Sequence, residues 1–189
     1  MILENNFVRL EVLNESHLEF LYEFIHQQEI WKYSLSPIKT KEDIKKYVET
    51  AIQYYHEGSQ LPFIVFDKLT NRYVGSTRLY EISTSNKRAK LGYTWYDKVV
   101  QGTKVNKSCK YLLLDYSFNQ LDFNRIEFNA DVRNEKSIFA MKSLGAEAEG
   151  VLRKHTILPD GYCRDTIVLS ILKDDWNKDL SEKLRQKLV

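Results

Sequence analysis

The hydrophobic positions change their spacing several times along the chain, and each change separates one predicted element from the next. Residues 7–12 alternate apolar and polar side chains, which is the period of a strand with one buried face. Other short stretches are rich in β-branched and aromatic residues and are bounded by turn residues. Together these patterns predict strands at residues 7–12, 61–67, 73–82, 90–97, 125–130, 148–156 and 164–172.

Between the strands, apolar residues recur three and four positions apart, which is the spacing of one helix face. A charged amphipathic segment from about Asp175 predicts a last helix, whereas the aromatic-rich segment 31–37 is expected to be irregular. The four helical faces before it are Leu18, Leu21, Tyr22 and Ile25; Ile44, Tyr47, Val48, Ala51 and Tyr55; Cys109, Leu112, Leu113 and Tyr116; and Ile138, Met141 and Lys142.

Capping residues mark where these helices begin and end. Ser16 is expected to open the first helix, and Thr40 with Asp43 resembles a capping box that opens the second. Asn134 is a good N-cap for the helix that follows the strand at 125–130. Glycines stand where two of the helices should end, at Gly58 and Gly145.

The order of the elements predicts an α+β fold in one domain, residues 1–189. Three strands follow one another between residues 61 and 97 without a helix, which is typical of an antiparallel meander. A helix then separates the third strand from the next, so strand, helix and strand alternate there. A mixed sheet follows from the two patterns together.

Composition narrows the class of protein. The chain has 43% hydrophobic and 29% charged residues with only 7 Gly and 3 Pro, the balance of a packed soluble domain. A net charge of +2 gives no strong field toward nucleic acid or an anionic membrane. Cys109 and Cys163 form no CxxC pair, and the sequence contains no signal-peptide or membrane-span pattern, so we expect a cytoplasmic protein. His17, His26 and His56 lack metal-ligand spacing, so no metal site is expected.

Residues 96–107 join a predicted strand to a predicted helix through Gly102 and several small or basic residues. The first turn of a helix carries unpaired backbone N–H groups and the positive end of the helix dipole, so it can bind a pyrophosphate. Lys104 and Lys107 would add positive charge there. Taken alone, the segment fits an ordinary turn with solvated lysines at least as well, because one glycine is a far weaker signal than a P-loop.

In combination with what surrounds it, this loop resembles that of the GNAT superfamily of acetyl-CoA-dependent N-acetyltransferases, and within it the RimJ/RimL-like branch. The likeness covers nearly the whole chain, and it is the order of the segments that makes it specific. The matching segments are RLEVLNESHLEFLYEF, YVGSTRLY, LGYTWY, QGTKVN, RIEFNADVRNEKSIFAMKSLGAEAEGVLRKH and RDTIVLSILKDDW.

The resemblance implies the GNAT fold, a mixed central sheet of about seven strands with helices on both faces. It also implies acetyl-CoA as co-substrate and a primary amine as acceptor, attacked directly. The acceptor pocket is then expected to include Trp31, Tyr33 and Tyr93. The residues expected to bind acetyl-CoA are Trp95, Tyr96, Gln101, Gly102, Thr103, Lys104, Val105, Asn106, Lys107, Asn134 and Ser137.

Two positions depart from the family pattern. Lys104 stands where the family usually has glycine, so its side chain either obstructs the pyrophosphate or turns outward and pairs with a phosphate. Lys90 stands where the branch commonly has an acid that acts as, or orients, a general base. The usual base therefore cannot be assigned by resemblance.

The missing acid bears on the choice of acceptor. At pH 7 a lysine side chain is neutral about 0.04% of the time and an α-amine roughly a tenth of the time, a difference of about 3.5 kcal/mol in the help that a base must give. We therefore expect a protein N-terminus or another amine of low pKa. Glu81 and His155 remain as candidate bases and Ser137 as the residue that protonates or positions the thiolate, although each also fits an ordinary structural role.

Other functions remain open from the sequence. The groove of a non-catalytic relative would serve as a binding module or sensor, and an active relative would acetylate a small-molecule amine such as a polyamine. A basic helix edge at Lys104, Lys107 and Lys110 would be needed for a nucleic-acid binder, which the low net charge disfavours. We expect no nucleic-acid or membrane partner, and a monomer or a homodimer.

Overall fold

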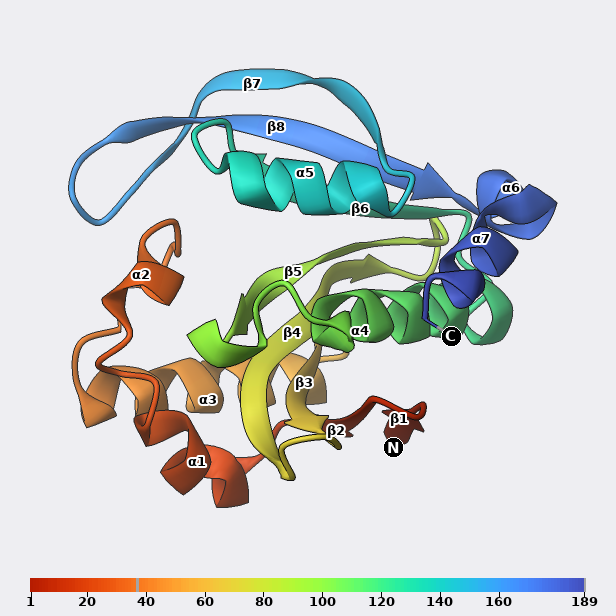
Figure 1. Cartoon of the computed structure of the whole chain (residues 1–189). Helices are drawn as coiled ribbons and strands as arrows, with labels where there is room; N and C mark the ends of the chain where they lie inside the picture. Colours follow the sequence, from red (N-terminus) through yellow and green to blue (C-terminus); the bar gives the residue numbers. More distant parts are fainter. Residues whose placement is uncertain (37, 189) are drawn as a thin grey trace.

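In the part of the chain that the structure describes, residues 1–36 and 38–188 of a computed structural model, eight strands form one mixed sheet (Figure 1). Their order across the sheet is β1-β2-β3-β4-β5-β6-β8-β7. The strands are β1 (Ile2–Glu4), β2 (Val8–Val12), β3 (Leu61–Asp67), β4 (Arg72–Ser83), β5 (Arg88–Tyr96), β6 (Arg125–Asp131), β7 (Glu147–Ile157) and β8 (Cys163–Leu172).

Helices connect and cover the strands. The meander β3-β4-β5 is antiparallel as predicted, and the helix after β5 makes the crossover that lets β6 pair with β5 in parallel. The helices are α1 (Leu18–Tyr22), α2 (Gln28–Trp31), α3 (Lys41–His56), α4 (Lys104–Asp115), α5 (Glu135–Ser143), α6 (Lys173–Asp175) and α7 (Ser181–Gln186), with helical turns η1 (Glu15–His17), η2 (Lys98–Val100), η3 (Tyr116–Gln120) and η4 (Trp176–Leu180).

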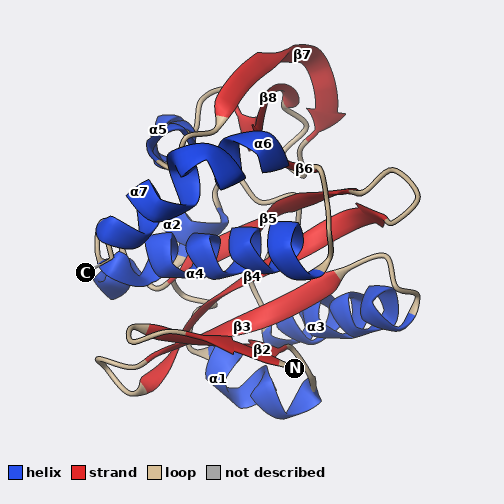
Figure 2. Cartoon of the chain, turned by 90° about the vertical axis from the view of Figure 1, so that its right-hand side faces the viewer, coloured by secondary structure: helices blue, strands red, loops and turns tan. Residues whose placement is uncertain are grey.

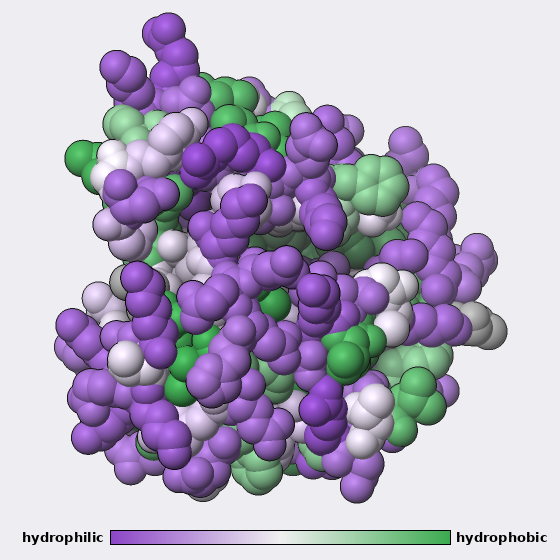
Figure 3. Space-filling view, turned by 60° about the vertical axis from the view of Figure 1, so that its left-hand side comes forward, coloured by the Kyte–Doolittle hydropathy of each residue, from purple (hydrophilic) through white to green (hydrophobic). Residues whose placement is uncertain are grey.

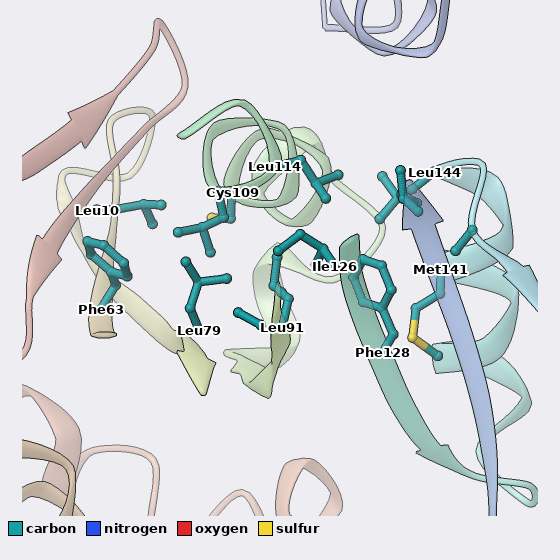
Figure 4. Close-up of a cluster of buried hydrophobic side chains, with 14 of the residues drawn as sticks. Leu10, Phe63, Leu79, Leu91, Cys109, Leu114, Ile126, Phe128, Met141 and Leu144 are labelled. Atoms are coloured by element: carbon teal, nitrogen blue, oxygen red, sulfur yellow. The ribbon is translucent and has the colours of Figure 1, made fainter. Parts of the chain in front are cut away.

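The predicted α+β fold with helices on both faces of the sheet is confirmed (Figure 2). Helices α1 and α3 cover one face of the meander, where a smaller buried cluster is built from their apolar stripes, Trp31, Ile64 and Trp95. On the other face α4 packs against a larger cluster that continues from β2 across to α5. Ten of its members are labelled in Figure 4: Leu10, Phe63, Leu79, Leu91, Cys109, Leu114, Ile126, Phe128, Met141 and Leu144.

Most helix boundaries lie where the capping residues predict. The Thr40 hydroxyl accepts from the backbone N–H of Asp43 and the Asp43 carboxylate accepts from that of Thr40, so the predicted capping box is present. Asn134 caps α5, and Gly145 adopts a φ of +93° after it. The Ser16 prediction is wrong, because Asn14 is the N-cap and the Ser16 N–H donates to its side chain.

Two short elements escaped the sequence patterns. Strand β1 has only three residues, too few for a period to be seen, and it makes the sheet eight-stranded instead of about seven. Residues 28–31 form the one-turn helix α2, which reaches only at Trp31 into the segment 31–37 that is expected to be irregular. Of the segment 31–37, Pro37 lies outside the described residues.

Candidate functional site

A groove opens where β5 and β6 diverge. These strands pair over only three positions, ending at Lys90 and Glu127, and the groove beyond them has a volume of about 1460 Å³. Figure 3 looks toward the side on which it opens: the surrounding surface is mainly hydrophilic, and hydrophobic side chains appear in the recessed middle. The predicted site residues that line the groove are Trp31, Tyr33, Glu81, Tyr93, Trp95, Tyr96, Gln101, Asn106, Asn134, Ser137 and His155.

A β-bulge produces the divergence of β5. Ser76 of β4 faces Trp95 and Arg78 faces Gly92, so Tyr93 and Thr94 together oppose the single residue Thr77. Tyr93 accordingly adopts a φ of +48°, a conformation that costs free energy in a non-glycine residue. The extra residue bends β5 away from β6 and leaves backbone polar groups of both strands facing the groove.

Close backbone packing holds the bent part of β5 in place. Gly75 of β4 lies opposite Tyr96, and a Cβ atom at Gly75 would lie 2.3 Å from the carbonyl oxygen of Trp95. No side chain fits there, because the obstacle is backbone. Glycine at this position therefore fixes where the Trp95–Tyr96 segment runs along the groove.

Asp97 anchors the loop that follows β5. It is 3% exposed, and its carboxylate accepts from the backbone N–H of Val99 and the side-chain amide of Gln27, both at 3.2 Å, and from the guanidinium of Arg72. The backbone N–H of Lys98 donates to the side-chain carbonyl of Gln27 at 3.1 Å. These bonds tie η2 to the segment before α2 and to β4.

The loop then enters α4 through a glycine turn followed by a capped first turn. Gly102 has a φ of +81°, which glycine adopts without strain, and Thr103 is the N-cap, its hydroxyl accepting from the N–H of Val105. The side chain of Asn106 faces the groove, and its Oδ1 is buried with no hydrogen-bond partner among the described residues. An orphaned buried acceptor beside a helix N-terminus fits a polar ligand that supplies a donor.

Lys104 turns away from the cradle that the Gly102 loop and the first turn of α4 form. Its Nζ donates to the carbonyl oxygen of Leu188 at 3.1 Å and lies 4.7 Å from the centre of the Phe7 ring. The side chain thus packs toward the C-terminal end of the chain. Four of the predicted cofactor-binding residues lie in the loop and the first turn of α4 and do not line the groove: Gly102, Thr103, Lys104 and Lys107. Val105 is buried in the larger core cluster.

The opposite wall of the groove comes from β6 and α5. The Asn134 side chain accepts from the backbone N–H of Ser137 at 3.1 Å, so the predicted pair is joined at the start of α5. Arg133 forms an ion pair with buried Asp131 at 2.7 Å and holds the pKa of that carboxyl below its usual range. The same guanidinium lies 3.6 Å from the centre of the Tyr162 ring, and the Tyr33 hydroxyl donates to the Arg133 carbonyl at 3.3 Å.

Aromatic residues form the floor of the groove beside α2 and α3. The rings of Trp31 and Trp95 are 4.7 Å apart, and each is 6% exposed. The Trp31 indole N–H donates to the Phe24 carbonyl at 3.0 Å, and the Trp95 indole N–H contacts the Tyr47 hydroxyl at 3.4 Å. Their polar atoms are satisfied, so these rings present rigid apolar surface to an acceptor.

The two candidate bases occupy different settings. The side chain of Glu81 is 55% exposed and pairs with Lys90 at 2.8 Å, and Lys90 also lies 3.4 Å from Glu127. His155 is exposed, and its Nδ1 contacts the hydroxyl of Thr166 at 3.1 Å. Both line the groove, and their catalytic roles stay predictions.

Sequence reasoning missed the most unusual residue of the groove, Lys110. It is 6% exposed and lines the groove, and its Nζ donates to the Thr94 hydroxyl at 2.6 Å and lies 3.4 Å from that of Thr77. Burial lowers the pKa of the Lys110 ammonium from 10.5 to about 7. The sequence signal that could have identified it is its position four residues before Leu114, which places Lys110 on the buried face of α4.

The nucleic-acid interpretation of α4 is wrong in its geometry. Lys110 is buried, and the exposed Lys104 is directed toward Leu188, away from the groove, so the three lysines do not form one basic edge. Three lysines on one sequence segment do not form a surface when the helix buries one of them.

Membrane-spanning and metal-binding features are both absent from residues 1–36 and 38–188. Within that range no helix has the length and apolarity needed to cross a bilayer, and no three His, Cys, Asp or Glu side chains cluster as a metal site would require.

Comparison with known proteins identifies relatives. Residues 8–147 match a family described as "Acetyltransferase (GNAT) domain". The chain is 30% identical over 102 residues to "Putative ribosomal N-acetyltransferase YdaF" of Bacillus subtilis, covering 54% of this chain and 55% of that protein. It is 24% identical over 172 residues to spermidine N(1)-acetyltransferase of Escherichia coli, covering 89% and 88%. The crystal structure of a "putative acetyltransferase" from T. thermophilus superposes with a TM-score of 0.89 at 30% identity, covering 100% and 97%.

Proposed function

Because the chain belongs to the GNAT acetyltransferase family, with RimJ/RimL-like relatives, we propose that it transfers the acetyl group of acetyl-CoA to the α-amine of a peptide N-terminus. The observation that carries this proposal is the charge of the groove. The name of the Bacillus subtilis relative, which refers to ribosomal N-acetylation, is in keeping with it.

The residues around the groove fit acetyl-CoA. Backbone N–H groups of the Gly102 loop and the first turn of α4 would bind the pyrophosphate, and the orphaned Asn106 Oδ1 would accept from the pantetheine arm. Backbone groups of Trp95 and Tyr96 would face the thioester, with N–H groups that stabilise negative charge on its oxygen. When bound, the cofactor supplies an activated acetyl group; the protein orients it and admits an amine from the aromatic side.

The charge of the groove argues against a polycationic acceptor. Seven Lys and Arg side chains line it against four acidic ones. Three of the four acids are already paired: Glu29 with Lys98, Glu81 with Lys90 and Asp131 with Arg133. A polyamine carries several positive charges that would find little compensation there, whereas a peptide N-terminus carries one and, at a pKa near 7.8, loses it readily.

The buried cation Arg78 adds to this argument. It is 2% exposed, with its guanidinium 4.6 Å and 4.3 Å from the ring centres of Tyr47 and Tyr93, two residues that line the groove. Its Nη1 donates to Gln60 at 2.9 Å, and its Nε and Nη2 are buried without a hydrogen-bond partner among the described residues. The positive charge behind these rings therefore repels a cationic acceptor.

Calorimetry and turnover together test the proposal. Acetyl-CoA should bind the wild-type protein with micromolar affinity, and Lys104→Gly should bind it about as well, because the Lys104 side chain lies outside the cradle. Turnover should be compared on a lysine-free peptide with a free N-terminus, the same peptide with a blocked N-terminus and one added lysine, and spermidine. Faster turnover of the first supports the proposal.

The other outcomes separate the remaining functions. Rapid acetylation of spermidine or of the lysine side chain, with none of the free N-terminus, would establish a different acceptor class. Binding of acetyl-CoA without turnover of any amine would establish a sensor. Absence of binding by the wild-type protein and recovery in Lys104→Gly would show that Lys104 closes the cradle and that the native groove binds something else.

A further inference from the structure

Lys110 is a buried cation without an anion. Its Nζ contacts two hydroxyls, that of Thr94 from β5 at 2.6 Å and that of Thr77 from β4 at 3.4 Å, and these hydroxyls also contact each other at 2.8 Å. No carboxylate lies within ion-pair distance of Nζ in the portion of the chain described here. A hydroxyl group can hydrogen-bond to a lysine nitrogen in its neutral form as well as in its charged form, so these contacts do not require the ammonium.

The neighbours of Lys110 do not restore a charge. The titratable group beside it on α4 is the thiol of Cys109, and burial raises the pKa of that thiol to about 12. Tyr96 of β5 contacts Cys109, and burial raises the pKa of the Tyr96 hydroxyl well above its usual value. Both stay protonated and neutral near pH 7. From β4 it faces Thr77. Desolvation by burial outweighs the opposing influence of Cys109, and the pKa of the Lys110 ammonium falls to about 7.

The bulge of β5 places this amine beside the reaction. Thr94 is one of the two bulged residues, next to the Trp95–Tyr96 segment that lines the groove, and Lys110 lines the same groove from α4. The opposite side of that groove carries Ser137 and Asn134. A hydroxyl-bound lysine nitrogen thus lies at the bulge of β5, in the wall of the groove.

We propose that Lys110 is the proton carrier of the acetyl transfer, taking the place of the acid that Lys90 replaces. This inference rests on the proposed function. Nζ, as the neutral amine, accepts a proton from the acceptor's ammonium, directly or through one water. The freed amine forms a bond to the acetyl carbon as the carbon–sulfur bond breaks, a second proton leaves the nitrogen for solvent, and the Lys110 ammonium protonates the departing sulfur.

Proton affinity selects the acceptor in this scheme. Moving a proton from an α-ammonium of pKa about 7.8 to an amine of pKa about 7 is unfavourable by about sixfold, whereas moving it from a lysine ε-ammonium is unfavourable by about 2,500-fold. Returning the proton to a thiolate, with an ordinary thiol pKa of about 8.5, is favourable. The pKa of Lys110 therefore lets it take a proton from an N-terminal ammonium and return that proton to the thiolate.

Two measurements test Lys110. In the apo protein labelled with ¹³C-lysine, the Cε resonance that disappears in Lys110→Met should titrate with a midpoint near pH 7. In turnover, kcat at saturating N-terminal peptide should rise with pH through the same midpoint, and Lys110→Met should lose that rise and about 100-fold in kcat. Lys110→Arg, which keeps the charge but holds its proton, should lose as much.

The controls keep the result decisive. Lys46→Met removes an exposed lysine on α3, outside the groove, and should leave kcat and its pH profile unchanged. A Lys110 that stays protonated at pH 9, or a folded Lys110→Met enzyme with kcat within threefold of wild type and an unchanged pH profile, overturns the role of Lys110 and leaves the proposed function standing. A wild-type protein that binds acetyl-CoA and acetylates no amine overturns both.

Discussion

Replacing Lys110 by methionine should stabilise the protein, and the gain should depend on pH. Methionine has nearly the same length and no charge, so it fills the same space on α4 without the cost of burying an ammonium. In the folded protein the pKa of Lys110 lies at about 7, against 10.5 for an exposed lysine. The folded state therefore binds the Lys110 proton more weakly than the unfolded chain does.

The magnitude follows from that difference. Below about pH 6, the shift corresponds to a penalty of about 5 kcal/mol on the free energy of unfolding. The variant escapes this penalty but leaves the hydroxyls of Thr77 and Thr94 with one partner fewer, at a cost of about 2 kcal/mol. We expect Lys110→Met to be about 3 kcal/mol more stable than wild type at pH 6.

The sign of the pH dependence is fixed by linkage. Between the folded pKa near 7 and the unfolded pKa of 10.5, the unfolded chain carries one more proton at Lys110 than the folded protein. Wild-type stability therefore rises through this window relative to the variant, and the advantage of the variant shrinks by about 1.4 kcal/mol per pH unit. Below about pH 6 the difference should be constant.

Urea unfolding at a series of pH values from 6 to 10, under reducing conditions, measures this difference. Other titrating groups are common to both proteins and cancel when the two free energies of unfolding are subtracted. Lys46→Met should differ from wild type by less than about 0.5 kcal/mol at every pH. The reasoning is refuted by a difference for Lys110→Met that stays constant between pH 7 and pH 10.

Further substitutions test the residues that hold the walls of the groove in place. Gly75→Ala should cost about 3 kcal/mol or more in urea unfolding, because its Cβ would lie 2.3 Å from a backbone oxygen, and should weaken acetyl-CoA binding measured by calorimetry; an unchanged stability would contradict the close packing. Asp97→Asn should cost about 2 kcal/mol, because it weakens the bonds from Arg72 and the Val99 N–H, and should raise the Kd for acetyl-CoA, whereas equal affinities would show that the loop does not depend on this anchor. Asn134→Ala should lower the unfolding free energy by about 1 kcal/mol through loss of the α5 N-cap, with Asn134→Asp as the control that keeps the cap.

Several features of the protein could be predicted from the sequence because local patterns specify them. The Thr40 and Asp43 pair predicts the start of α3, and the period of the apolar residues predicts seven of the eight strands to within a few residues. The family could also be inferred, because its loop and strand segments occur in a fixed order along the chain. Strand β1 could not, since three residues on the edge of a sheet carry too little pattern.

The candidate site could be predicted in part. The sequence places Gln101, Asn106, Asn134 and Ser137 on elements that meet at one groove, and the structure brings their side chains there. It could not say where Lys104 points, because the Leu188 carbonyl to which that side chain donates lies 84 residues away in the chain.

The sequence by itself determined most of the elements, because each depends on neighbours within a few residues, and it determined the family through the order of those elements along the chain. Only the tertiary structure decided which lysines of α4 are exposed and which are buried. On α4, Lys104 lies at the surface and Lys110 is buried between hydroxyls of β4 and β5, although both are lysines of the same helix. The difference is one of burial and of partners distant in sequence, since the charge of a side chain depends on the dielectric and the groups that folding places around it.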